Sequence, residues 1–178
     1  GAHISGISWS ESMLPYLNTY YLDCDFTTWQ STAGAGNTEQ RAMNCVSWYQ
    51  AYAFCIWDHG RLPTQWEWQL AATAGAARDY PWTESEPPTC ARSNFLINLD
   101  ESGVPCHDGP DVVGQRPQGD GPWKHADMLG NVREWVLDFD GYLNLTECRD
   151  CAKTSATDFR LMMNGGWMSS MNDMTVKR

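Results

Sequence analysis

Two carboxylates, Asp127 and Glu134, lie on either side of a Gly-Asn pair in the segment 126–135. A Gly-Asn turn can direct backbone carbonyls inward, so the carbonyls of Gly130 and Val132 would join both carboxylates in an all-oxygen shell. Oxygen ligands of this kind suit a hard cation such as calcium. The same residues are also compatible with a solvated acidic turn covered by a tryptophan, and spacing alone does not separate these two interpretations.

The chain has 178 residues and a formal net charge of −10. Its length is that of one domain with a real core. The acidic balance argues against a nucleic-acid partner, because phosphate binding needs clustered Lys and Arg. No apolar run approaches the ~18 residues that a membrane span needs. The first residues lack the basic and apolar regions of a signal peptide, so we expect a mature or trimmed N-terminus.

Seven cysteines without tandem C-x-x-C pairs of the zinc type favour disulfides and an oxidising compartment, either extracellular or periplasmic. The sequence does not fix their pairing. We favour three local bridges, which leave Cys24 without a partner: Cys45–Cys55, Cys90–Cys106 and Cys148–Cys151. A redox C-x-x-C is the alternative for the last pair, but that motif normally opens a helix, whereas this one follows a polar loop.

Two capping boxes predict the two helices. The first, Ser47-x-x-Gln50, predicts a helix over residues 48–58, and apolar side chains around most of its surface indicate that it is buried. The second, Thr64-x-x-Glu67, predicts a helix that ends by Gly75. Alternating or apolar residues predict strands over 20–29, 132–139 and 159–163.

Residues 79–125 are rich in Pro, Gly, Asp and Ser, which predicts a long loop. Such a loop is functional, disordered, or ordered by metal and disulfides. We interpret three isolated histidines as surface or structural residues and not as zinc or iron ligands: His59, His107 and His125. Asn144-Leu145-Thr146 is an N-glycosylation sequon, meaningful in a source that glycosylates secreted proteins.

Several of these segments together resemble the formylglycine-generating enzyme (sulfatase-modifying factor) family. Segment 126–135 looks like its G-N-V-W-E-W signature, with Arg133 where the family has tryptophan. Four further segments are similar to family motifs, in family order: 46–55 to V-S-W-x-x-A-x-A-[YF]-C, 60–68 to G-x-R-L-P-T-E-A-E-W, 80–82 to Y-P-W, and 160–167 to R-V-x-x-G-G-S-W.

The resemblance implies an α+β, C-type-lectin-like fold of the sulfatase-modifying-factor subclass, with two helices, short strands and much irregular loop held by calcium. We expect one domain over residues 1–178, with 1–19 as an N-terminal extension. The family's closing G-F-R strand is missing, so we expect another chain to complete the fold or this chain to be incomplete. The resemblance also implies a second calcium shell, formed by Asn94, Asp108 and the carbonyls of Phe95 and Pro110.

Oxidases of the family bind copper through two cysteines just after the G-G-S-[WY] turn. Carried over residue by residue, these positions are Ser169 and Met174. A hydroxyl and one thioether are poor substitutes for the two thiolates that select soft Cu(I). We therefore expect no copper and name no catalytic residue. The related non-haem iron enzymes of ergothioneine synthesis need a histidine triad, which the four histidines do not form.

Three hypotheses follow. The first is a secreted, calcium-stabilised binding or structural module whose protein or carbohydrate ligand is unknown. The second is an assembly subunit that pairs through its C-terminal edge, and the third is a copper- and oxygen-dependent cysteine oxidase with altered ligands. Variable proteins of diversity-generating retroelements use the same subclass and bind through the G-G-x-W segment. Five methionines cluster there, and they suit either an adaptable contact surface or core packing: Met162, Met163, Met168, Met171 and Met174.

Overall fold

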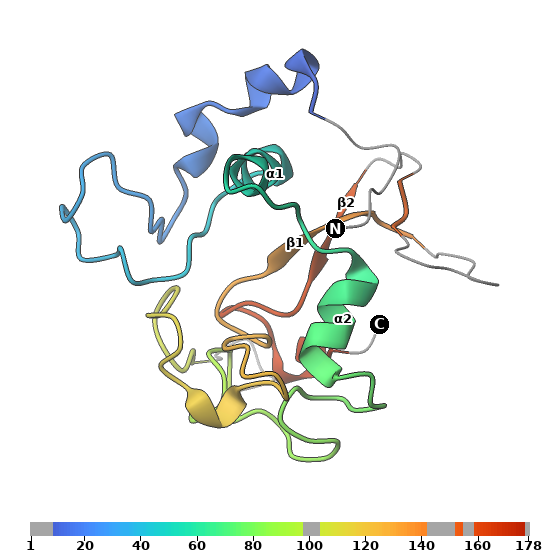
Figure 1. Cartoon of the computed structure of the whole chain (residues 1–178). Helices are drawn as coiled ribbons and strands as arrows, with labels where there is room; N and C mark the ends of the chain where they lie inside the picture. The colour runs from blue at the N-terminus through green and yellow to red at the C-terminus, as the bar shows by residue number, and fades with distance from the viewer. Residues whose placement is uncertain (1–8, 98–103, 142–151, 155–158, 177–178) are drawn as a thin grey trace.

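The computed structural model describes residues 9–97, 104–141, 152–154 and 159–176 (Figure 1). The fold is α+β, with few helices, short strands and much loop, in agreement with the sequence-based prediction. Its elements in these ranges are, in chain order, the 3-10 helices η1 (Glu11–Tyr16) and η2 (Thr19–Leu22), α1 (Trp48–Trp57), α2 (Gln65–Thr73), η3 (Pro117–Gly119), β1 (Glu134–Phe139), β2 (Arg160–Met163) and η4 (Met171–Asp173).

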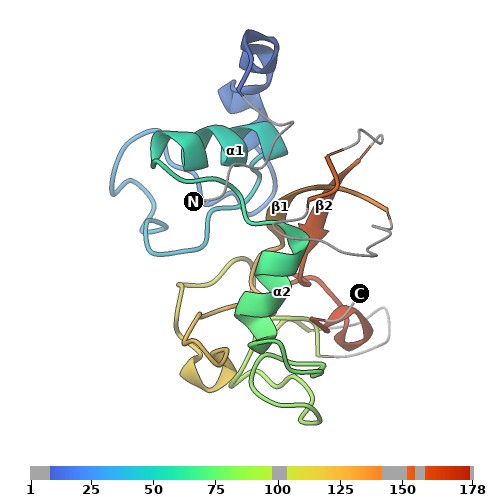
Figure 2. The same ribbon diagram turned by 45° about the vertical axis from the view of Figure 1, so that its right-hand side comes forward.

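The two strands form an antiparallel pair, and α1 and α2 both contact β1 (Figures 1 and 2). Glu134 pairs with Met163 and Trp135 with Met162, and an irregularity follows before Phe139 pairs with Arg160. Burial alternates along β2, where Leu161 and Met163 are buried, so this strand places every second side chain in the core.

Both helices begin at the predicted capping boxes. At α1, the Gln50 amide donates to Ser47 Oγ (3.2 Å) and the Ser47 amide to Gln50 Oε1 (2.8 Å). At α2, Thr64 and Glu67 repeat the same reciprocal pair. The second helix ends where Ala74 adopts a left-handed conformation (φ 53°), directly before Gly75.

Three tryptophan indoles join the helical segments to β1. Trp48 Nε1 donates to the carbonyl of Val136 (2.8 Å), and Trp68 Nε1 donates to Glu134 Oε2 (2.6 Å). In the opposite direction, Trp135 Nε1 donates to the carbonyl of Val46 (2.9 Å), just before α1. Each indole therefore buries a large apolar surface and also satisfies its polar N–H.

The helix faces differ from the sequence-based prediction. Helix α1 buries Trp48 and Tyr52, but Phe54 is 61% exposed and Trp57 is 74% exposed, so the expectation of a largely buried helix was wrong. Helix α1 contacts β1 and η1. The apolar side chains on its remaining surface are therefore not covered by these elements. In the described ranges, no helix is long and apolar enough to cross a membrane.

The predicted strand over residues 20–29 was also wrong. The chain forms η2 over Thr19–Leu22 and then turns, with Phe26 in a left-handed conformation (φ 62°) that ends any extended run. Side-chain hydrogen bonds replace a ladder here, because Thr27 Oγ1 donates to the carbonyl of Leu22 (2.7 Å) and Asn44 Oδ1 accepts from the amide of Thr28 (2.8 Å).

The disulfide pattern corrects one of the predicted pairings. Cys45 bonds to Cys24, with Cα atoms 6.0 Å apart, and the Cys55 thiol is free. Helix α1 disfavours pairing of Cys45 with Cys55, since its rise of about 1.5 Å per residue places Cys55 about 10 Å along the axis from Trp48, near which Cys45 lies, and a disulfide spans at most ~7 Å between Cα atoms. The Cys90–Cys106 bridge is present, as predicted. Cys148, Cys151 and the sequon residue Asn144 lie outside the described residues.

Candidate functional site

The Gly-Asn turn before β1 adopts a tight left-handed conformation. Asp127, Gly130 and Asn131 have φ values of 55°, 93° and 62°. A methyl group at Gly130 would collide with Ser93 Oγ and lie 2.6 Å from the carbonyl oxygen of Asn94, so only glycine is accommodated. The buried Asn131 fixes the turn, because its Oδ1 accepts from the amide of Asp111 (2.8 Å).

Three backbone carbonyls of this turn point at one atom. The Nδ2 of Asn164 lies 3.1 Å from the oxygen of Gly130, 3.4 Å from that of Val132 and 3.5 Å from that of Asp127. One amide nitrogen has two hydrogens for these three acceptors. Asn164 is itself held by the amide of Gly130, which donates to its Oδ1 (2.7 Å). The partial positive charge of this NH₂ group therefore lies where oxygens converge, as they would around a cation.

Both predicted carboxylates belong to the same surroundings. Burial raises the pKa of Glu134, and the negative charge of Asp127 raises it further. Burial also raises the pKa of Asp127, whose Oδ2 accepts from the amide of Gly114 (2.7 Å). A bound cation would favour the charged form of both groups. The positive charge of Arg116 acts on Asp127 in the opposite direction and lowers its pKa. Inward-facing carbonyls and two carboxylates are oxygen donors of the kind that calcium prefers. We call these residues, with Asn164, the Gly-Asn turn site.

The residues predicted for a second calcium shell are engaged differently. Asn94 Oδ1 accepts from the amide of His107 (2.9 Å), and the Phe95 carbonyl accepts from the amide of Cys106 (2.9 Å). The Pro110 carbonyl accepts from the guanidinium of Arg41 (2.8 Å), which already supplies a positive charge there. Asp108 is exposed. This second site stays a prediction.

The two positions that correspond to copper cysteines lie next to each other. A methyl group at Gly165 would lie 2.6 Å from Met174 Sδ and 3.0 Å from Ser169 Oγ, so both side chains face the same spot beside this glycine. Met174 is buried in the main core, where it is 1% exposed. Ser169 is also buried, and its Oγ accepts from the amide of Gly166 (2.9 Å). This place therefore carries a hydrogen-bonded hydroxyl and a thioether that is packed in the core.

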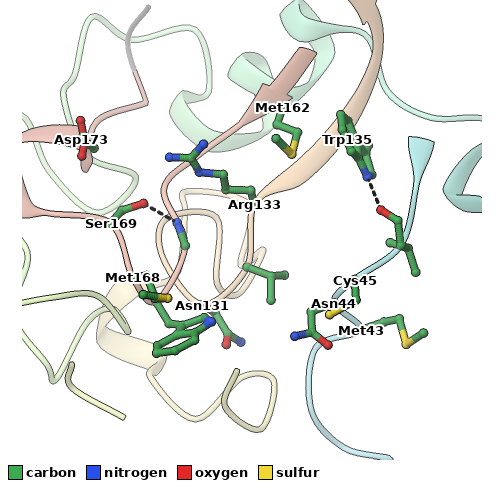
Figure 3. Close-up of a pocket in the computed structure, with 14 residues that line it drawn as sticks. Met43, Asn44, Cys45, Asn131, Arg133, Trp135, Met162, Met168, Ser169 and Asp173 are labelled. Carbon is green, nitrogen blue, oxygen red and sulfur yellow. Dashed lines mark hydrogen bonds between the residues drawn. The ribbon is translucent and has the colours of Figure 1, made fainter. Parts of the chain in front are cut away.

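A hollow of about 380 Å³ opens beside Ser169 (Figure 3). We call it the Trp167 hollow. Its walls come from the segment 43–46, from the turn before β1, from both strands, and from residues 166–169. The exposed Arg133 borders it, and Phe26 packs edge-on against Trp167 with ring centroids 4.9 Å apart. The predicted methionine cluster is divided, since Met163 and Met174 are buried in the core whereas Met162 and Met168 line the hollow.

Comparison with known proteins identifies the family. Residues 9–178 match the family described as "Sulfatase-modifying factor enzyme 1-like domain". The chain belongs to this family. Among curated relatives, the chain is 32% identical to the Bos taurus protein named "Inactive C-alpha-formylglycine-generating enzyme 2" over 66% of this chain and 40% of that protein. It is 30% identical to the "Hercynine oxygenase" of Mycobacterium tuberculosis over 68% of this chain and 28% of that protein.

The chain thus spans less than half the length of either curated relative. A solved structure, "Treponema denticola variable protein 1", has the same fold with a TM-score of 0.62 and 18% identity, over 89% of this chain and 72% of that one. The turn and both carboxylates are predictions from a local motif, and the two positions that correspond to copper cysteines come from the family resemblance; their metal roles stay predictions. Asn164 was missed, because it is far from the turn in sequence and its Met-Asn-Gly-Gly context carries no ligand signal.

Proposed function

We propose that this chain is a calcium-stabilised binding module without oxidase chemistry, and that its ligand binds in the Trp167 hollow. The observation that carries the proposal is the side-by-side placement of Ser169 and Met174 at Gly165. Cysteine oxidation in this family depends on a thiolate pair at these positions, according to the resemblance. A hydroxyl that accepts a backbone hydrogen bond and a thioether packed in the core do not offer Cu(I) an equivalent site.

The relationship to a protein named as inactive supports this proposal. The relationship to a hercynine oxygenase favours iron chemistry instead, but that alternative lacks side-chain support. Among the described residues, no group of three or more His, Cys, Asp or Glu side chains is placed to hold a metal. The Gly-Asn turn site depends on backbone carbonyls, which suit calcium and not a redox metal.

The chemistry of the Trp167 hollow supports a binding role. Trp, Met and Arg side chains border it, and these residue types are enriched at protein interfaces. Unbranched Met162 and Met168 can repack around ligands of different shape. The exposed Arg133 offers a planar donor for a carbonyl or carboxylate. A protein surface, with an apolar group in the hollow and an acceptor at Arg133, is the ligand that this lining favours, and a second copy of the chain is one such partner.

Calcium would stabilise the fold and would take no part in a reaction. Bound at the Gly-Asn turn site, it would be held by the carbonyls of Asp127, Gly130 and Val132 with the carboxylates of Asp127 and Glu134. These residues lead directly into β1, and Arg133 between them borders the hollow. Two disulfides are compatible with an extracellular or periplasmic compartment, where calcium is abundant.

A Cu(I) titration in competition with a chromogenic chelator tests the proposal. The intact chain is compared with a Ser169→Ala, Met174→Ala double variant, and Cys55→Ser serves as the control for binding by the free thiol. We expect the double variant to bind Cu(I) no more weakly than the intact chain. Tight one-to-one binding that the double variant loses, and that Cys55→Ser retains, would establish a metal site at Gly165 and overturn the proposal.

A further inference from the structure

A second hollow lies between η2 and the loop that follows it. Figure 1 draws this part of the chain in blue. The volume of the hollow is about 780 Å³, and it shares no lining residue with the Trp167 hollow. Two aromatic side chains, Tyr20 and Trp29, line it together with the carboxylate of Asp23. We call it the Tyr20–Trp29 hollow.

Both aromatic side chains of this hollow expose surface to solvent. Tyr20 is 81% exposed, which is unusual for a large aromatic side chain, and Trp29 keeps 37% of its surface exposed. Within the described residues, the Trp29 indole N–H and the Asp23 carboxylate have no hydrogen-bond or ion-pair partner. Two solvent-exposed aromatic rings, an indole donor and a carboxylate therefore border one concavity.

The walls are fixed before any ligand arrives. The Cys24–Cys45 disulfide closes the loop at one end. Hydrogen bonds join Thr28 to Asn44, the residue that directly precedes Cys45. Farther along, the side-chain oxygen of Gln30 accepts from the amide of Gly36 (2.5 Å). A preformed concave site lowers the entropic cost of binding.

The charge of the hollow selects the ligand. Asp23 lines it, and no Lys, Arg or His is among the described residues that do so. The chain as a whole has a net charge of −10, which disfavours anions and attracts cations. Aromatic faces bind organic cations through the ring quadrupole, and a nearby carboxylate adds direct attraction. We propose that the Tyr20–Trp29 hollow binds an organic cation of the quaternary ammonium class. This inference is independent of the Trp167 hollow and of calcium.

Saturation-transfer NMR on the full chain tests the proposal, with choline as the probe and its N-methyl protons as the signal. The matched control ligand is 3,3-dimethylbutanol, which has the shape of choline without its charge. We expect saturable choline binding that Trp29→Leu weakens about five- to thirtyfold. Asp23→Asn should weaken it about fivefold. Trp123→Leu, at a tryptophan that is 61% exposed and does not line the hollow, should leave it unchanged.

Tyr20→Leu is a second test, at a side chain that is 81% exposed. Circular dichroism establishes that each variant is folded. Equal binding of choline and 3,3-dimethylbutanol would show a merely apolar hollow and overturn the proposal. So would saturable binding of methyl glucoside with no response to choline, which would show a saccharide site. Choline binding that survives both Trp29→Leu and Tyr20→Leu would place the cation elsewhere and also overturn it.

Discussion

Asp138 is expected to be one of the most important single side chains for the stability of this fold. It is fully buried on β1, at 0% exposure. Its Oδ2 accepts from the amide of Gln65 (2.8 Å), which is the first residue of α2, and its Oδ1 accepts from the amide of Lys153 (2.7 Å). The carboxylate therefore joins β1 to the positive N-terminal end of α2 and to the segment that precedes β2.

The expected cost of removing this group follows from those two bonds. A hydrogen bond to a charged group contributes about 1.5–3 kcal/mol, and a buried donor left without a partner adds a desolvation penalty. Asp138→Ala should therefore lower the free energy of unfolding by about 3–5 kcal/mol, out of a total of about 5–15 kcal/mol for a typical domain. Asp138→Asn keeps one acceptor and turns its NH₂ group toward a backbone donor, so we expect a loss of about 1.5–3 kcal/mol.

Urea unfolding of the oxidised chain, followed by tryptophan fluorescence, measures these losses. The control is Glu84→Gln, at an exposed residue in the loop that follows α2. That change should stay within about 0.5 kcal/mol of the unchanged chain. If Asp138→Ala also stayed within this range, the link between β1 and α2 would not be structural and our account of how the sheet positions α2 would be wrong.

Three further predictions concern acid stability, the thiol and calcium. A hydrogen bond from Arg61 lowers the pKa of Glu67 from 4.5 to about 2, so the stability it adds is complete above pH 4.5 and is lost as the pH falls toward 2; acid unfolding of Glu67→Gln should show a shallower pH dependence in that window. Burial raises the pKa of the Cys55 thiol, so alkylation at neutral pH should be slower than in the unfolded chain, and non-reducing peptide mapping should recover Cys24 linked to Cys45, not Cys45 to Cys55. Chelation of calcium should lower the melting temperature by about 5–10 °C relative to calcium at 100-fold its dissociation constant, and Glu134→Gln should remove most of this response.

Local sequence signals predicted the helices because capping is a local interaction. Ser47 and Thr64 each begin a helix through a bond to the amide of the third helical residue, so the signal and the structure lie within one turn. Which face of a helix is buried depends on distant partners. The Trp66 and Leu70 face of α2 is 46% and 54% exposed, whereas Trp68 is buried because Glu134 and the core of β1 lie on its side.

The difference between local and distant interactions also explains which parts of the candidate site can be predicted from the sequence. Gly130 was recognised because a tight turn requires glycine, a property of its own backbone. Asn164 converges on that turn only because β1 and β2 pair, which brings together residues 34 positions apart. The partner of Cys45 was missed for a related reason, since sequence distance favoured Cys55 and the rigid α1 between them was not weighed against it.

We propose that a hard cation, and not thiolate-bound copper, is the metal of this chain. The most direct test is elemental analysis of the chain after its free thiols are alkylated and it is equilibrated with both Ca²⁺ and Cu(I). We predict one or two calcium ions per chain and no copper, with the calcium content reduced in Glu134→Gln. One copper ion per chain with no calcium, lost on Ser169→Ala, Met174→Ala substitution, would contradict this account.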